Sequence, residues 1–139
     1  MDRVNELYSI AEEKGVEVYN FPLPVTGSLS EEIDGRPVIG MDSTRRFTRA
    51  EEAARLGHEL GHCLYGGFYT VKTPFDLRER HEVRADRWYI LHFIPEDKLM
   101  AMLKAGMDAY EIAEELDTTE EYVRRAYYYY KDVKGGLFH

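Results

Sequence analysis

The sequence predicts an α+β fold that is mostly helical, with a small antiparallel sheet and a helical C-terminal half. Three observations support this prediction. Apolar residues recur at helical spacing in residues 2–14 and over most of the chain after residue 48. Strand-like residues occur in short runs between residues 16 and 43, where glycine and proline interrupt them. The composition is 44% hydrophobic and 32% charged, which is typical of a globular protein.

The N-terminal part is expected to combine one helix with about three short strands. Residues 2–14 form the expected helix, and residues 16–21 (VEVYNF) follow as a strand. Residues 27–43 are expected to form a hairpin about the Asp34-Gly35 turn. Because these apolar runs are short, we expect a small antiparallel sheet that packs on the helix that follows it.

From residue 48 onward the chain is expected to be helical. Thr48 and Glu51 have the spacing of a capping box, which predicts a helix that begins at Thr48 and ends near Tyr65. A second helix is expected over residues 76–93, because Pro95 ends the pattern. Three shorter helices are then expected, over residues 95–105, 108–116 and 119–131.

The length of 139 residues fits a single domain, residues 1–139. Within it we expect a core over residues 1–94 and a helical extension over residues 95–139. The single cysteine, Cys63, leaves no internal disulfide, and the N-terminus lacks the apolar core of a signal peptide. No run approaches the ~20 apolar residues that span a membrane. These features predict a cytoplasmic protein with no membrane partner, and they leave the oligomeric state open.

Two histidines in residues 58–62 (HELGH) are four positions apart. On a helix each residue turns about 100°, so His58 and His62 lie about 40° apart and can bind one ion. Glu59 is turned about 100° from His58, which suits a base acting on a metal-bound water better than a third ligand. The face away from the histidines carries three leucines, which are expected to face the core: Leu56, Leu60 and Leu64.

A catalytic zinc ion needs three protein ligands and one open position. The extended motif with a further histidine fails, because that position is Phe68. Glu82 and Asp86 share one face of the next helix, so Glu82 is predicted as the third ligand. Asp86 is predicted to accept a hydrogen bond from the far nitrogen of one histidine. His81 is a rival ligand, but an exposed histidine at the helix start is the preferred interpretation.

Several other polar residues are candidates for roles near this site. Cys63 is expected to be a small buried thiol beside it, and His92 a packed helix residue. His139 is expected to be idle in the tail. Stabilisation of an oxyanion needs a further hydrogen-bond donor, and the sequence leaves four candidates open: Tyr65, Tyr69, His81 and Tyr89.

These segments together resemble the ImmA/IrrE family of zinc metallopeptidases. RRFTRAEEAARLGHELGHCLY is similar to the family's HELGH helix, and EVRADRWYILHFIP is similar to its Glu-x-x-Ala-Asp/Asn helix. The resemblance implies one zinc ion per chain, held by His58, His62 and Glu82, with Glu59 as the catalytic glutamate and Asp86 at the Asp/Asn position. Family members are encoded on phages and mobile elements or act in stress responses, and they often cleave helix-turn-helix repressors. The resemblance implies that substrate class.

The predicted function is therefore a zinc-dependent endopeptidase whose partner is a protein substrate such as a transcriptional repressor. The alternative is a regulatory or DNA-binding module with a structural or catalytically silent zinc site, because residues 109–130 are compatible with a helix-turn-helix. Charge weighs against direct nucleic-acid binding. The chain carries a net charge of −8, and residues 95–139 hold six Lys and Arg against ten Asp and Glu. Packing of these helices on the core is the preferred interpretation.

Overall fold

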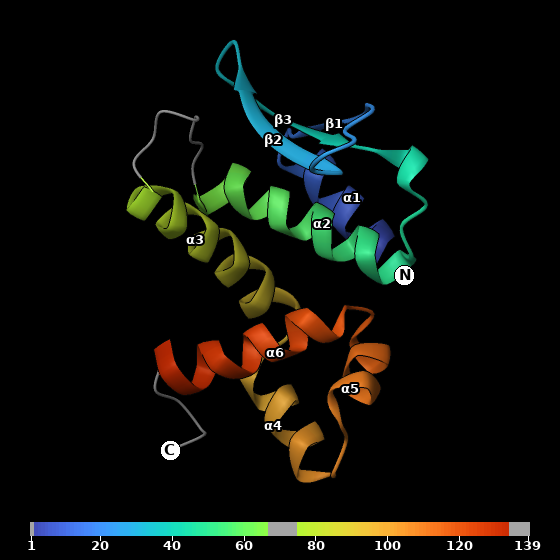
Figure 1. Ribbon diagram of the computed structural model, residues 1–139, viewed down its shortest axis with the longest axis vertical. Helices are drawn as coiled ribbons and strands as arrows, with labels where there is room; N and C mark the ends of the chain where they lie inside the picture. Colours follow the sequence, from blue (N-terminus) through green and yellow to red (C-terminus); the bar gives the residue numbers. More distant parts are fainter. Residues whose placement is uncertain (1, 67–74, 134–139) are drawn as a thin grey trace.

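The computed structural model describes residues 2–66 and 75–133, with the side chains of residues 2–64 and 82–132 (Figure 1). The described part has the mostly helical α+β fold that the sequence predicts. Its helices and strands are α1 (Arg3–Glu13), β1 (Glu17–Asn20), β2 (Ser28–Ile33), β3 (Arg36–Met41), α2 (Arg49–Gly61), α3 (Phe75–Phe93), α4 (Glu96–Lys104), α5 (Ala109–Leu116) and α6 (Glu120–Tyr128). A short 3-10 turn, Ser43–Arg45, precedes α2, and π-helical turns follow α2 (His62–Gly66) and α6 (Tyr129–Val133).

The sheet has the strand order β1-β3-β2, and it is mixed rather than wholly antiparallel as expected. The β2–β3 hairpin is antiparallel, and its turn residues Asp34 and Gly35 have positive φ angles of 51° and 77°. β1 instead pairs in parallel with β3, with Glu17 opposite Val38. The chain reverses once between β1 and β2 and again in the hairpin, so β1 and β3 run in the same direction.

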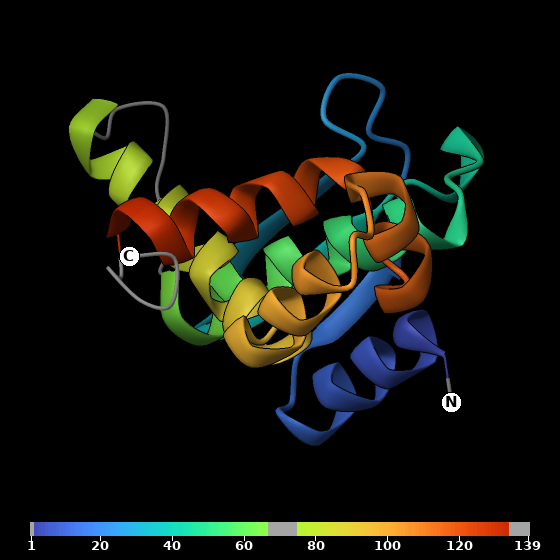
Figure 2. The same cartoon turned by 90° about the horizontal axis from the view of Figure 1, so that it is seen from below.

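The helices α1 and α2 lie on the same face of the sheet, as Figure 1 shows, and α6 lies on the far side of α2. Figure 2, the view from below, shows the same order, with α6 in front of α2 and the sheet behind it. The helices α1 and α2 each begin at a side chain that caps the helix. Asp2 caps α1 by accepting a hydrogen bond from Asn5 N, and the Thr48–Glu51 capping box predicted for α2 is present. The core therefore forms where α1, α2 and the sheet meet.

The leucine face of α2 is buried as predicted. Leu56 and Leu60 are fully buried, and Leu64 packs at the edge of the core. The hydrophobic cluster continues through α3 into the C-terminal helices, and its largest fully buried side chains are Tyr89, Tyr130, Phe93, Leu7, Ile39, Leu56, Leu60, Ile90, Ile94, Leu99 and Ile112. One continuous core therefore joins the N-terminal elements to the helices after residue 95.

Two glycines bring α2 unusually close to α3. A Cβ atom built on Gly61 would lie 2.4 Å from the carbonyl oxygen of Ala85. A Cβ atom built on Gly57 would lie 2.0 Å from Cδ1 of Tyr89, so the tyrosine ring fills the space that a side chain would need. Because heavy atoms in cores pack at about 3.5–4.0 Å, only glycine fits at either position. This contact determines the spacing of the two helices that carry the candidate site.

The helices after residue 95 are fastened to the core by polar contacts. Tyr89 Oη and Thr118 Oγ1 lie 2.9 Å apart in a buried hydrogen bond, and Arg3 Nη2 donates to the carbonyl oxygen of Leu116 at 3.2 Å. The Arg3 guanidinium also lies over the Phe93 ring, 4.3 Å from its centroid. The helices after residue 95 therefore pack on the core, which is the interpretation preferred from the sequence. None of the helices in the described part of the chain has the length and apolar character that crossing a bilayer requires.

Gly61→Ala tests the close approach of α2 and α3. Alanine favours a helix over glycine by about 1 kcal/mol, whereas overpacking a core costs about 1–3 kcal/mol. The clash here is with backbone atoms of Ala85, which cannot turn away as a side chain can, so we expect a net loss of unfolding free energy. Urea unfolding of the metal-free protein measures it. An unchanged or increased stability would contradict the close contact.

Candidate metal centre and active site

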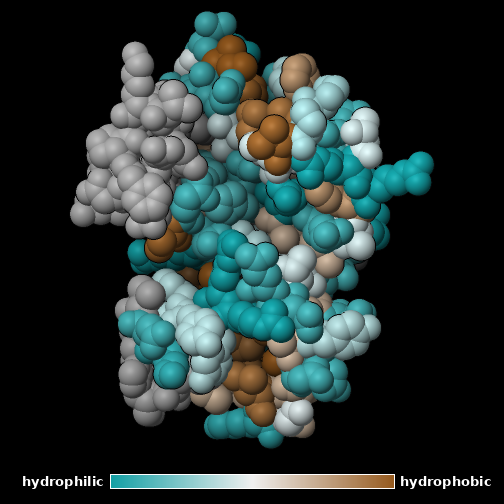
Figure 3. Space-filling model, viewed as in Figure 1, coloured by the Kyte–Doolittle hydropathy of each residue, from teal (hydrophilic) through white to brown (hydrophobic). Residues whose placement is uncertain are grey.

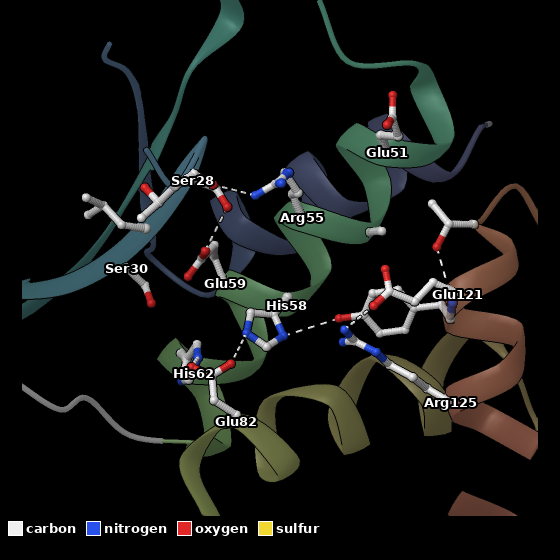
Figure 4. Close-up of a pocket in the computed structure, with 15 residues that line it drawn as sticks. Ser28, Ser30, Glu51, Arg55, His58, Glu59, His62, Glu82, Glu121 and Arg125 are labelled. Carbon is white, nitrogen blue, oxygen red and sulfur yellow. Dashed lines mark hydrogen bonds and ion pairs between the residues drawn. The ribbon is translucent and has the colours of Figure 1, made fainter. Parts of the chain in front are cut away.

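Helices α2 and α3 bring together the three residues predicted as metal ligands. His58 Nε2 lies 2.6 Å from Glu82 Oε2, and His62 Nε2 lies 3.1 Å from Glu82 Oε1 (Figure 4). One ligand atom from each of the three residues can be chosen so that all lie within 4.8 Å of one another. The two histidine rings are 4.8 Å apart at their centroids and nearly perpendicular. The carboxylate of Glu82 therefore faces both imidazoles.

The donor set fits a divalent metal ion. Two imidazoles and one carboxylate leave a fourth position open, as in catalytic zinc sites. The electrostatic surroundings also favour a cation. Burial alone would lower the pKa of His58, but the neighbouring carboxylates of Asp86 and Glu82 outweigh it and raise the pKa to about 10. The site thus attracts positive charge, which either a proton or a metal ion supplies.

Asp86 holds the ring of His58 from behind. Its Oδ1 atom lies 2.8 Å from His58 Nδ1, the nitrogen that faces away from Glu82. When this nitrogen carries the proton, the lone pair of Nε2 points toward Glu82 and can bind a metal ion. Burial would raise the pKa of Asp86, but hydrogen bonds from His58 and Tyr122 and the charges of His58 and Arg125 lower it below its usual value. Asp86 therefore stays ionised and accepts hydrogen bonds.

Glu59 lies next to the ligand cluster, which consists of His58, His62 and Glu82, but on a different side of α2. Its side chain is buried, and Oε2 accepts a hydrogen bond from Ser28 Oγ on β2 at 2.8 Å. Glu59 and the three ligand residues line the same cavity. This arrangement suits a base that handles a proton in the cavity and does not itself bind the metal.

The cavity has a volume of about 570 Å³ and lies between β2, α2 and α6. Figure 3 shows mostly hydrophilic residues on the face that includes the region between α2 and α6. The cavity is lined by Thr26, Ser28, Leu29, Ser30, Glu51, Ala54, Arg55, His58, Glu59, His62, Glu82, Thr119, Glu121, Tyr122 and Arg125. The volume lies within the range of ligand-binding pockets.

The candidates for oxyanion stabilisation have different outcomes. Tyr89 does not line the cavity, since it is fully buried against Gly57 and its hydroxyl bonds to Thr118. As a candidate oxyanion donor Tyr89 is therefore corrected to a core residue, because its ring packs between Gly57 of α2 and Tyr122 of α6 rather than facing the cavity. Tyr69 and the side chains of Tyr65 and His81 lie outside the described residues.

Cys63 and His92 are not members of the group formed by His58, His62 and Glu82, and His139 is not among the described residues. Cys63 packs at the edge of the core, where burial and the charge of Glu59 raise the pKa of its thiol to about 12. His92 stacks on Trp88, with ring centroids 5.0 Å apart.

Three residues near the centre were missed by the reasoning from sequence. Ser28 contacts Glu59, while Tyr122 and Arg125 of α6 both contact Asp86. No spacing rule connects them to the site, because they lie 31, 36 and 39 residues from the groups that they contact. Only the fold brings these segments together.

Most of the chain matches a known protein family. Residues 11–127 match the family described as the IrrE N-terminal-like domain, Peptidase M78. The matched region contains the whole ligand cluster and extends into α6. No curated protein and no solved structure gives a significant match.

Glu82→Ala tests the assignment of the third ligand. Because the variant loses a carboxylate that faces both histidines, we expect zinc affinity to fall by more than the ~10–100-fold typical of an outer-shell substitution. Competition with a chromophoric chelator measures the affinity. Glu114→Ala, which removes an exposed carboxylate from α5, is the matched control and should leave it unchanged. Equal affinities in the two variants would rule out Glu82 as a ligand.

Proposed function

The chain belongs to the IrrE N-terminal-like peptidase family, and from this premise we propose that it is a zinc-dependent endopeptidase. The observation that carries the proposal is the convergence of His58, His62 and Glu82 beside the buried carboxylate of Glu59. The family supports the reaction class, hydrolysis of a peptide bond. The cavity around the cluster supports a polypeptide substrate.

Zinc is the metal that the donor set favours, with one ion per chain. Two imidazole nitrogens and one carboxylate oxygen are a common ligand set of catalytic zinc, and they leave a position open for reaction. A purely structural zinc site tends to have four protein ligands. The three-residue cluster together with the neighbouring Glu59 therefore supports a catalytic rather than a structural ion.

Glu59 is the residue to which we assign proton transfer. Ser28 Oγ holds its Oε2 atom, and Glu59 lines the cavity together with His58, His62 and Glu82, where a water molecule can reach it. Glu59 accepts the proton of the water that attacks the peptide carbonyl and then donates it to the departing amine nitrogen. When bound at His58, His62 and Glu82, the metal supplies the Lewis acidity that activates this water and polarises the carbonyl.

The substrate class that we propose is a helix-turn-helix transcriptional repressor of a phage, a mobile element or a stress regulon. Charge supports it, because DNA-binding repressors carry basic surfaces and this chain has a net charge of −8. A repressor substrate would place the reaction in the cytoplasm. Direct binding of nucleic acid is disfavoured, because residues 95–139 hold ten Asp and Glu against six Lys and Arg.

Glu59→Gln separates metal binding from catalysis. Glutamine keeps the shape of the side chain but cannot accept the proton, and general acid–base groups contribute about 10²–10⁴-fold to rate. We expect zinc affinity close to that of the wild type and a loss of cleavage of that size. Metal analysis and a peptide-cleavage assay on the same preparation measure both. Wild-type activity in the zinc-loaded variant would exclude the mechanism.

The substrate proposal predicts limited cleavage of a repressor. Incubation of the zinc-loaded protein with candidate helix-turn-helix repressors should yield discrete fragments, which mass spectrometry can assign to a single bond. Because charge attraction is screened by salt, cleavage should slow at high ionic strength. The Glu59→Gln protein serves as the control for contaminating proteases. Equal cleavage by wild type and variant would count against the proposal.

A further inference from the structure

Three hydrogen-bond donors converge on the carboxylate of Asp86. His58 Nδ1 lies 2.8 Å from Oδ1, and Tyr122 Oη donates to the same oxygen at 2.6 Å. Arg125 Nη1 donates to the other oxygen, Oδ2, at 3.0 Å. Two of the three donors thus come from α6, a helix that follows the ligand residue Glu82 by about forty positions. Figure 4 shows Arg125 pointing from α6 toward His58.

The two oxygens of Asp86 are fixed in different ways. Tyr122 and His58 share Oδ1, and Tyr122 Oη itself lies 3.2 Å from His58 Nδ1. The Arg125 guanidinium occupies the opposite oxygen, so a rotation of the carboxylate would break both contacts at once. With both oxygens held, Oδ1 stays in line with His58 Nδ1. The ring of His58 is therefore oriented from α6 through Asp86.

Tyr122 is held by packing, whereas Arg125 is 41% exposed and is supported by contacts along α6. The Tyr122 side chain is buried, and its ring packs on Tyr89 with centroids 4.7 Å apart. Arg125 lies over the Tyr122 ring, 4.9 Å from its centroid, and also pairs with Glu121 one turn earlier on α6. Since Tyr89 also packs against Gly57 on α2, the tyrosine pair connects α6 to the helix that carries His58 and leads directly into His62.

We propose that Tyr122 and Arg125 are positioning residues of the metal centre, which act on His58 through Asp86. They keep the carboxylate where it accepts the Nδ1 proton, so that Nε2 of His58 faces the other two ligands. The inference extends the proposed function to the C-terminal helices and rests on it for the presence of the metal. It makes α6 part of the site rather than a separate extension.

The test measures zinc affinity in Tyr122→Phe and Arg125→Gln by competition with a chelator. Phenylalanine keeps the ring that packs on Tyr89 and removes only the hydroxyl. Outer-shell partners of metal-bound histidines are worth ~10–100-fold in affinity, and we expect about 10-fold for each variant. Tyr128→Phe and Arg124→Gln are the matched controls on the same helix, because both residues are exposed, and they should retain wild-type affinity.

A second measurement separates positioning from a general effect on packing. Both residues are inferred to act through Asp86, so Tyr122→Phe should have no further effect on zinc affinity in an Asp86→Ala background.

The zinc-loaded wild type should also show a downfield proton resonance from His58 Nδ1, and the exchange of this proton with water should accelerate in Tyr122→Phe and Arg125→Gln. Arg125→Lys keeps a positive charge, so its affinity should lie between those of wild type and Arg125→Gln.

Two results would overturn the inference. One is wild-type zinc affinity in both Tyr122→Phe and Arg125→Gln, and the other is an equal loss from Tyr122→Phe with and without Asp86. Each is distinct from a failure of the proposed function. A wild-type protein that binds zinc but cleaves nothing would refute the peptidase while leaving the affinity comparison decisive. A wild-type protein that does not bind zinc would refute both.

Discussion

The contact between Gly61 and Ala85 determines the geometry on which the rest of the site depends. It sets how closely α2 and α3 approach, and one turn before Ala85 the helix α3 carries Glu82 toward the two histidines. A larger side chain on either glycine of α2 would separate the helices and move the carboxylate away from the imidazoles. A metal ligand cluster requires positions accurate to a few tenths of an ångström. Helix packing therefore sets the geometry of the candidate metal site.

Electrostatics in the site follow from the same packing. The carboxylates of Glu82 and Asp86 lie on opposite sides of the His58 ring, and their charges outweigh the cost of its burial. Arg125 balances part of this negative charge at Asp86. Glu59 is kept apart from the cluster by its contact with Ser28 on β2. The acidic groups therefore divide into one that can bind a metal, one that orients a ligand and one that is available for proton transfer.

Local rules predicted the elements well, because they depend on neighbouring residues. The capping box at Thr48 and Glu51, the Asp34-Gly35 turn and the leucine face of α2 all occur as expected. Pairing between distant strands is not a local property, and the parallel contact of β1 with β3 was not predicted. The same reason explains the correction at Tyr89, whose residue type fits an oxyanion donor. Only packing against Gly57 shows that it is part of the core.

Helical spacing in the sequence is enough to identify the candidate ligand residues. The four-residue spacing of His58 and His62, with Glu82 and Asp86 on one face of the next helix, follows from helical periodicity alone. The distant groups that complete the site are brought to it only by the packing of the whole chain. Ser28 reaches Glu59 from the sheet, and Tyr122 and Arg125 reach Asp86 from α6, since packing joins segments that share no periodic relation. Spacing along a helix carries information over one or two turns, whereas these contacts depend on how the whole core closes.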